Sequence, residues 1–209
     1  GATGRDLIEA YVIGCEVGLA VDHATRYHQN QMHRGFHSTG ILGRLGAAAA
    51  CAKLLKLDEH QTTMALGMAG SMASGVIHNF GTMTKPLHAG MTCRDGVMAA
   101  QLAQRGLTAG EQILEHPVGF VQTVIGEGHY ELDEMAENLG KPFRIQDALI
   151  IKKYPCCGGN HAMLDSLFSM MREHNFTYED VAHAEIDQSY VSTVMLYTEP
   201  DDPLKGKFS

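Results

Sequence analysis

The chain has 209 residues, of which 44% are hydrophobic and 19% charged, and its net charge is −8. This length supports one substantial core, or one domain and part of a second. The acidic balance argues against a general nucleic-acid binder, and Glu9 and Glu16 interrupt the most apolar run, which argues against a membrane span. Five cysteines without a CxxC pair favour a reducing, cytoplasmic compartment.

Up to residue 140 the hydrophobic pattern is typical of helices alone. Helices are predicted over 5–21, 41–57, 59–74, 86–105, 108–116, 118–125 and 131–139. The first is apolar on almost every side and is expected to be buried, with Gly14 and Gly18 allowing another helix to approach closely. Asp58 and Gln61 have the spacing of a capping box at the start of the third predicted helix.

Cations, a histidine and a helix start converge within residues 80–96. Pro86 suits the first turn of a helix, which places Lys85 at the helix N-terminus, where free N–H groups favour an anion. His88 follows in the first turn and Arg94 lies two turns in. In an acidic chain this local positive charge indicates a carboxylate or phosphate site. The alternative is a lysine at an ordinary exposed helix start. Leu87, Met91, Met98 and Leu102 are expected on one face of this helix.

A second group of interest surrounds His37, which lies between Gly35 and Gly40 ahead of an Ala-rich helix. A histidine in such a turn is suited to acid/base work or to binding an anion, and a purely structural histidine is the alternative. His33 and His37 have the i,i+4 spacing of a helical zinc site, but Gly35 lies between them and no Glu follows His33. We therefore predict no metal here.

The pattern changes after residue 142. Residues 148–154 and 181–189 are predicted as strands on either side of a helix over 160–173, with Asn160 as its N-cap. A lone two-stranded unit leaves its edges exposed, so we expect further sequence beyond the C-terminus. The fold prediction is therefore mainly α, with a helical-bundle domain over 1–142 followed by part of a smaller α/β lid domain over 143–209.

Chemically versatile side chains gather around the first predicted strand end and the following helix start, where α/β units commonly bind ligands. They are Lys152, Lys153, Tyr154, Cys157 and His161. Cys157, near lysines and just ahead of a helix, has the setting of a thiolate, and a half-buried turn cysteine is the alternative.

Three motifs, in order, closely resemble the MmgE/PrpD family, which includes 2-methylcitrate dehydratase, cis-aconitate decarboxylase and iminodisuccinate epimerase. They are Arg34-Gly35-Phe36-His37-Ser38-Thr39-Gly40, Lys85-Pro86-Leu87-His88-Ala89-Gly90 and Lys152-x-Tyr154-Pro155-x-Cys157-x-x-x-His161. The resemblance runs over essentially the whole chain. It implies a helical domain and a lid with the active site between them, a homodimer formed through the helical domain, and no iron–sulfur cluster or other cofactor.

By motif position, the resemblance implies that His37, Lys85, Lys152 and Cys157 are catalytic. Substrate-binding contacts are expected from Arg34, His88, Arg94, Tyr154 and His161. Two departures bear on the substrate: Met91-Thr92-Cys93-Arg94-Asp95 replaces a frequent Asn-Ala-Ala-Arg-Asn, and Gly158-Gly159-Asn160 replaces bulkier residues. Family members are also roughly twice this length, so segments are expected before Gly1 and after Ser209.

The chemistries of the family share a carbanion formed beside a carboxylate, which needs a base near neutral pKa and cations where negative charge develops. We expect Lys85 and Lys152 to hold carboxylates of a di- or tricarboxylate from opposite sides of the cleft, and His37 to transfer the proton. Cys157 or Tyr154 would be a second acid/base group. Dehydration is ranked first, with epimerisation or decarboxylation as alternatives.

Two rival functions come from other classes. One is a metal-dependent hydrolase that uses His28, His33 and His37. The other is a carboxylate-binding fragment without catalysis.

Overall fold

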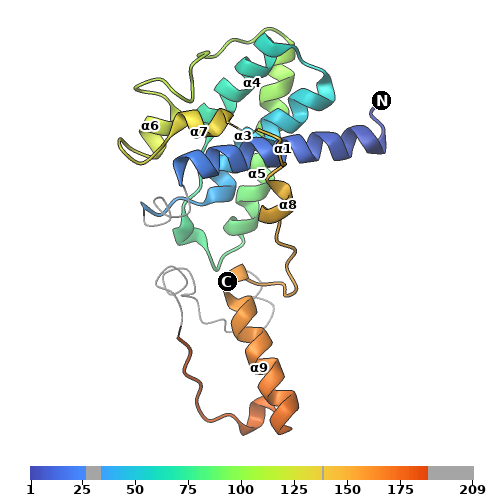
Figure 1. The fold of residues 1–209 in the computed structure, drawn as a ribbon, viewed down its shortest axis with the longest axis vertical. Coiled ribbons are helices and arrows are strands. Elements are labelled where there is room, and N and C mark those ends of the chain that lie inside the picture. The colour runs from blue at the N-terminus through green and yellow to red at the C-terminus, as the bar shows by residue number, and fades with distance from the viewer. Residues whose placement is uncertain (27–33, 138, 188–209) are drawn as a thin grey trace. The chain divides into compact units, whose positions relative to one another are not determined.

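The computed structural model describes residues 1–26, 34–137 and 139–187. These residues form two compact units. The helical unit comprises Gly1–His78 and Pro86–Leu149, and the C-terminal unit comprises Asn79–Lys85 with the described chain from Ile150 onward. The helices, shown in Figure 1, are α1 Gly4–Thr25, α3 Ser38–Leu55, α4 Glu59–Met72, α5 Thr84–Gln104, α6 Phe120–Val124, α7 Leu132–Ala136, α8 Ile145–Ala148 and α9 His161–His174. Short 3₁₀ helices lie at Ile77–Asn79, Gly158–Asn160 and Tyr178–Asp180.

Local capping signals account for two helix starts. Thr3 and Asp6 form a capping box ahead of α1, with Thr3 N–H donating to Asp6 Oδ2 at 2.7 Å. Asp58 and Gln61 form a second box ahead of α4, where Gln61 N–H donates to Asp58 Oδ1 at 2.8 Å. The capping box predicted at Asp58 is therefore confirmed.

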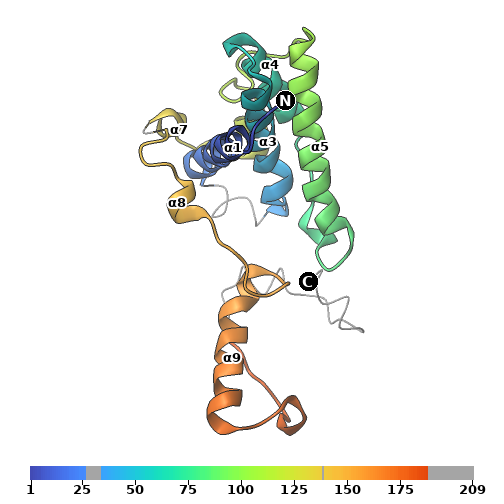
Figure 2. The same ribbon diagram turned by 90° about the vertical axis from the view of Figure 1, so that its right-hand side faces the viewer.

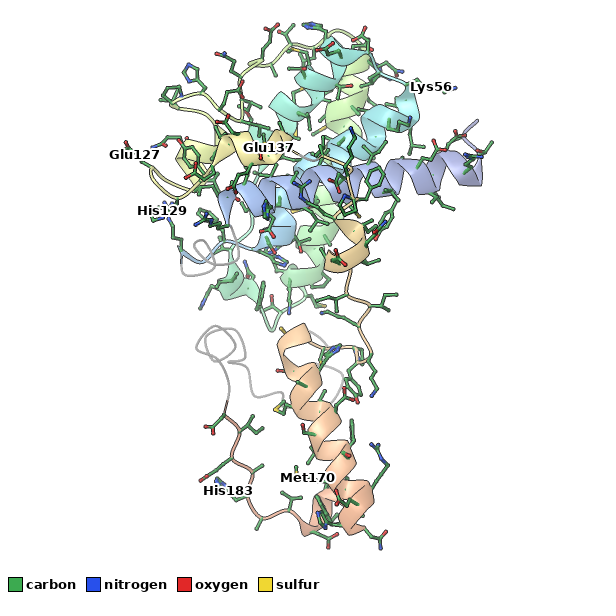
Figure 3. The ribbon with its side chains drawn as sticks, viewed as in Figure 1. Lys56, Glu127, His129, Glu137, Met170 and His183 are labelled. Carbon is green, nitrogen blue, oxygen red and sulfur yellow. The ribbon has the colours of Figure 1, made fainter. Side chains whose placement is uncertain are left out.

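The core of the helical unit is built on α3. This helix packs against both α1 and α4, and α7 and α8 pack against α1 (Figures 1 and 2). Small residues allow close approach, because a Cβ placed on Gly14 would lie only 2.7 Å from the carbonyl oxygen of Gly46. The close approach expected at Gly14 is confirmed. The larger core side chains include Ile41, Leu45, Met64 and Phe120.

The prediction that the first helix is buried is wrong for its N-terminal half. The large side chains of its N-terminal half are exposed, with Leu7 at 60%, Ile8 at 66% and Tyr11 at 53%. The buried positions are mainly small ones such as Ala10 and Ala20. The close contact with α3 explains this, because only small residues fit between two backbones at that distance.

The predicted apolar face of α5 is likewise not its buried face. Leu87 and Met98 are exposed, at 53% and 38%, whereas His88, Thr92 and Asp95 are buried. The helix itself is confirmed over Thr84–Gln104, with Pro86 in its first turn and Lys85 as its second residue. Polar groups of α5 therefore lie inside the helical unit, where each needs a partner.

No helix forms over residues 108–116, where a short one is predicted; residues 108–110 are irregular and 111–115 form turns. This segment lies against α4, since a Cβ on Gly67 would meet the Ala109 side chain at 2.7 Å and one on Gly70 would meet Ile113 at 3.1 Å. The predicted helices at 118–125 and 131–139 are confirmed in shorter form as α6 and α7.

The described residues contain no strand, so the strand predicted over 148–154 is wrong, as is the described part of the one over 181–189, up to residue 187. Residues 145–148 form α8, and irregular chain follows. A strand needs a neighbour to pair its N–H and carbonyl groups, and the described chain offers these segments none. The mainly α fold is confirmed. The helix after residue 160 is confirmed as α9, although the Asn160 side chain makes no capping hydrogen bond.

The segment that leads to α8 is attached to α1 by a buried charge. Glu16 is 3% exposed and accepts hydrogen bonds from the Gly140 N–H at 2.9 Å and from the Arg144 guanidinium at 2.6 Å. Burial would raise the pKa of Glu16, but these hydrogen bonds outweigh it and lower the pKa below its usual value.

No helix in the described ranges is both long and apolar enough to cross a bilayer.

Candidate active site

His37 occupies the turn that opens α3. It is the N-cap residue, with φ −86° and ψ 116°, and its side chain makes no capping hydrogen bond. Its backbone N–H donates to the Gly75 carbonyl at 3.1 Å, which ties the turn to the chain after α4. The imidazole is therefore carried by a fixed backbone without being used to cap the helix.

His88 faces His37 from the first turns of α5. The two Nδ1 atoms lie 3.0 Å apart, and the ring centroids are 5.2 Å apart. His88 is only 6% exposed, whereas His37 is half-buried. Two histidines 51 residues apart are thus joined by one hydrogen bond.

The surroundings of His88 disfavour its charged form. Gly75, with φ +128°, lies so close that a Cβ there would be 3.4 Å from His88 Nδ1. Burial lowers the pKa of His88 first, and the positive charge of Arg44 lowers it further. Both effects favour the neutral form of His88.

A buried ion pair supports the loop beside the two histidines. Arg44, 1% exposed, donates through Nε to Asp95 Oδ2 at 2.7 Å, and Asp95 is 2% exposed. The Arg44 guanidinium also donates to the Ser74 carbonyl at 2.7 Å, to the Ser74 hydroxyl at 3.1 Å and to the Gly40 carbonyl. Burial would raise the pKa of Asp95, but hydrogen bonds from Arg44 and then Arg94 lower it.

Two arginines predicted to bind substrate have protein partners. Arg94 donates to Asp95 Oδ1 through Nε at 2.8 Å and through Nη2 at 2.5 Å, while its side chain remains 62% exposed. Arg34 donates to the carbonyls of Val124 and Ile125, at 3.0 and 3.2 Å, at the end of α6. Their placement accounts for a structural role of each, and their role toward a substrate stays a prediction.

The C-terminal unit brings lysines and thiols together. Lys85 Nζ lies 4.3 Å from the centroid of the Phe80 ring. Burial lowers the pKa of Lys85; the Cys157 thiol opposes this shift, and the Lys152 ammonium adds to it. Lys152 Nζ donates to the Cys156 carbonyl at 2.8 Å. Three of the four residues predicted to be catalytic therefore lie in this unit. We call Lys85, Lys152 and Cys157 the lysine–thiol cluster.

Tyr154 and His161 lie near the start of α9. The Tyr154 hydroxyl donates to Asp165 Oδ1 at 2.6 Å, and Lys153 Nζ is 2.5 Å from the same oxygen. The His161 ring meets Tyr154 edge-on, with centroids 5.3 Å apart. Within the described residues, His161 Nε2 and Asn160 Oδ1 are buried and have no hydrogen-bond partner. Those two atoms retain their capacity to bind a polar group.

Comparison with known proteins decides the family. The model of the MmgE/PrpD N-terminal domain matches residues 1–133, which include the histidine pair and the Arg44–Asp95 ion pair. The chain belongs to the MmgE/PrpD family. The resemblance seen in the three motifs is thereby confirmed.

The MmgE/PrpD relatives include cis-aconitate decarboxylases. The chain is 38% identical over 118 residues to the human cis-aconitate decarboxylase, covering 56% of the chain and 24% of the relative. The mouse cis-aconitate decarboxylase is 30% identical over 177 residues, covering 85% of the chain and 36% of the relative. The cis-aconitate decarboxylase-like protein oryM of Aspergillus oryzae is 29% identical over 178 residues, covering 82% and 36%. The chain thus spans about a third or less of the length of these relatives.

The described residues contain no group of three or more His, Cys, Asp or Glu side chains arranged to hold a metal ion. His28 and His33, named for the rival metal site, lie outside the described residues, so that rival is untested.

Arg44, Asp95 and Asp165 are the residues of the candidate site that sequence reasoning missed. A signal existed for Arg44, because an arginine within the otherwise apolar run of α3 must find a buried partner. Nothing local identified Asp95 as that partner, because 51 residues separate the two.

Proposed function

We propose that the protein carrying this chain is an MmgE/PrpD enzyme that acts on a di- or tricarboxylate by moving a proton next to a carboxylate. The observation that carries the proposal is the Nδ1–Nδ1 contact of 3.0 Å between half-buried His37 and buried His88. A histidine held this way is suited to general acid/base catalysis near neutral pH. We assign proton transfer to His37.

The lysine–thiol cluster is proposed to bind the carboxylates. Burial and the charge of Lys152 lower the pKa of Lys85, while the Cys157 thiol raises it. A bound anion would stabilise the charged forms of both lysines. The Tyr154 hydroxyl already donates to Asp165, which favours Cys157 as the second acid/base group.

Decarboxylation is the outcome that we propose first. The human and mouse relatives are named cis-aconitate decarboxylases, a name that specifies a tricarboxylate and loss of carbon dioxide. Dehydration, ranked first by sequence, would use the same histidine in the opposite direction, to take a proton from the substrate, and is the second candidate. The homodimer and the cytoplasmic location stay predictions.

The test is turnover by the full-length protein in deuterated water, followed by proton NMR and by carbon dioxide release. The panel contains cis-aconitate, 2-methylcitrate and iminodisuccinate. Carbon dioxide release with deuterium on the product carbon is expected from cis-aconitate. A new alkene without carbon dioxide would establish dehydration, and inversion alone would establish epimerisation. Binding without any exchange would leave a carboxylate-binding protein and contradict the proposed catalysis.

Replacing Lys85 with Met should lower kcat/KM by about 10²- to 10³-fold, as loss of one preorganised group that stabilises charge typically does. Methionine keeps an apolar stem beside Phe80 and removes only the ammonium. The measurement is steady-state kinetics on the substrate found above. Lys53→Ala, on the exposed last turn of α3, is the matched control and should leave kcat/KM unchanged. Near-normal kcat/KM in Lys85→Met would refute the assignment of Lys85.

A further inference from the structure

The contact between His37 and His88 constrains where the protons of the pair lie. At a separation of 3.0 Å, one Nδ1 must carry the hydrogen and the other must offer its lone pair. Two protonated Nδ1 atoms would repel each other, and two bare ones would form no bond. One of the rings is therefore the donor, and the choice decides which atom of His37 can exchange a proton with a substrate.

His88 is the ring that stays neutral. It is 6% exposed, and the Arg44 guanidinium that disfavours its charged form is itself 1% exposed and held by Asp95 at 2.7 Å. Desolvation and a permanently charged neighbour both oppose a second proton on His88. His37 is half-buried, so it keeps more contact with solvent than His88 does.

The two possible arrangements differ in what happens when His37 gains a proton. If His88 donates to His37, a protonated His37 would carry hydrogen on both nitrogens, and the contact would become repulsive. If His37 donates to His88, the same hydrogen bond persists in both charge states of His37. Only the second arrangement supports repeated proton transfer without a rearrangement of the pair.

We propose that His88 is a positioning residue that accepts the Nδ1–H of His37 and thereby leaves Nε2 of His37 as the atom that transfers the proton. The identity of the reaction rests on the proposed function, whereas the tautomer assigned to His37 does not. In decarboxylation, the carbon–carboxyl bond breaks, its electron pair stays on the substrate carbon, and the Nε2 proton of the His37 imidazolium passes to that carbon. In proton abstraction, the substrate proton passes to Nε2, and in both cases Nδ1–H remains bonded to His88.

The first test separates positioning from substrate binding. His88→Leu removes the acceptor and should lower kcat by about 10- to 100-fold with KM unchanged, the range typical for loss of a group that orients a reactive side chain. His88→Asn places an amide oxygen near the position of Nδ1 and should recover most of the kcat. A higher KM with unchanged kcat would overturn the proposal in favour of substrate binding. Equal losses in both variants, or a lower melting temperature with normal kcat, would also overturn it.

The second test reads the tautomer without turnover. In the full-length protein labelled with ¹⁵N-histidine and free of substrate, neutral His37 should show a protonated Nδ1 and a bare Nε2. His88→Leu should convert this to a mixture of tautomers, whereas His60→Asn, on the exposed surface of α4, should leave it unchanged. A protonated Nε2 on neutral His37 would refute the proposal. Absence of turnover on every carboxylate would refute the proposed function alone.

Discussion

Replacing His37 with Asn is expected to lower kcat by about 10²- to 10⁴-fold, the range that general acid/base groups contribute. The loss should come without loss of stability. His37 is the N-cap of α3 and makes no side-chain capping bond, whereas Asn is among the best N-cap residues. The amide can also still hydrogen-bond to His88. Steady-state kinetics and thermal unfolding of the full-length protein measure the two effects together.

His60→Asn is the matched control for this substitution. His60 lies on α4 with its side chain 64% exposed, so its replacement should change neither kcat nor the melting temperature. If His37→Asn kept kcat within a few-fold of the unsubstituted enzyme, proton transfer by His37 would be excluded. If both kcat and the melting temperature fell together, His37 would be a structural residue of the α3 turn.

The sequence allows the helices to be predicted wherever a signal is local. The capping box at Asp58 and the Ala- and Gly-rich composition of residues 41–57 act within a few residues, and the structure has helices α3 and α4 there. The buried faces were less predictable, because the contact between Gly14 and Gly46 decides which side of α1 is covered. Which side chains are buried depends on the partner helix, and no short stretch of sequence contains the two helices together.

The strand predictions failed for a related reason. Residues 148–154 are apolar and β-branched enough to read as a strand, yet a strand forms only by pairing with another. Ile150 and Ile151 are 80% and 86% exposed, so the described chain gives these side chains nothing to pack against. The local pattern therefore identified the apolar residues correctly but predicted the wrong backbone conformation for them.

The candidate site also combines residues that local motifs predict with a contact that only the fold reveals. The motifs predicted His37, Lys85, Lys152 and Cys157 as site residues by position. The structure places His37 3.0 Å from His88, and it places Lys85, Lys152 and Cys157 in one unit. The Arg44–Asp95 ion pair behind the histidines belongs to no motif. It was missed because a salt bridge between α3 and α5 has no local sequence signature.

Replacing Asp95 with Ala should lower the free energy of unfolding by about 3–5 kcal/mol, since it leaves the Arg44 charge buried without its partner. Asp95 is 2% exposed and Arg44 1%. Chemical denaturation of the full-length protein measures the loss. The pKa of Asp95 is lowered by its arginine hydrogen bonds against the effect of burial, so its ionised form stabilises the fold above the ordinary pKa of 3.8. That stabilisation disappears as the pH falls through the lowered pKa, and the difference between the two proteins should shrink there.

Arg94→Ala provides the comparison that makes the Asp95 result specific. Arg94 donates to the same carboxylate, at 2.8 and 2.5 Å, but its side chain is 62% exposed. Its loss should cost less than about 1 kcal/mol, because water replaces an exposed partner readily. A similar small loss for Asp95→Ala would mean that Arg44 finds sufficient partners in the carbonyls of Gly40 and Ser74. The turn that carries His37 would then be held by hydrogen bonds to the backbone, and the ion pair would not be required for it.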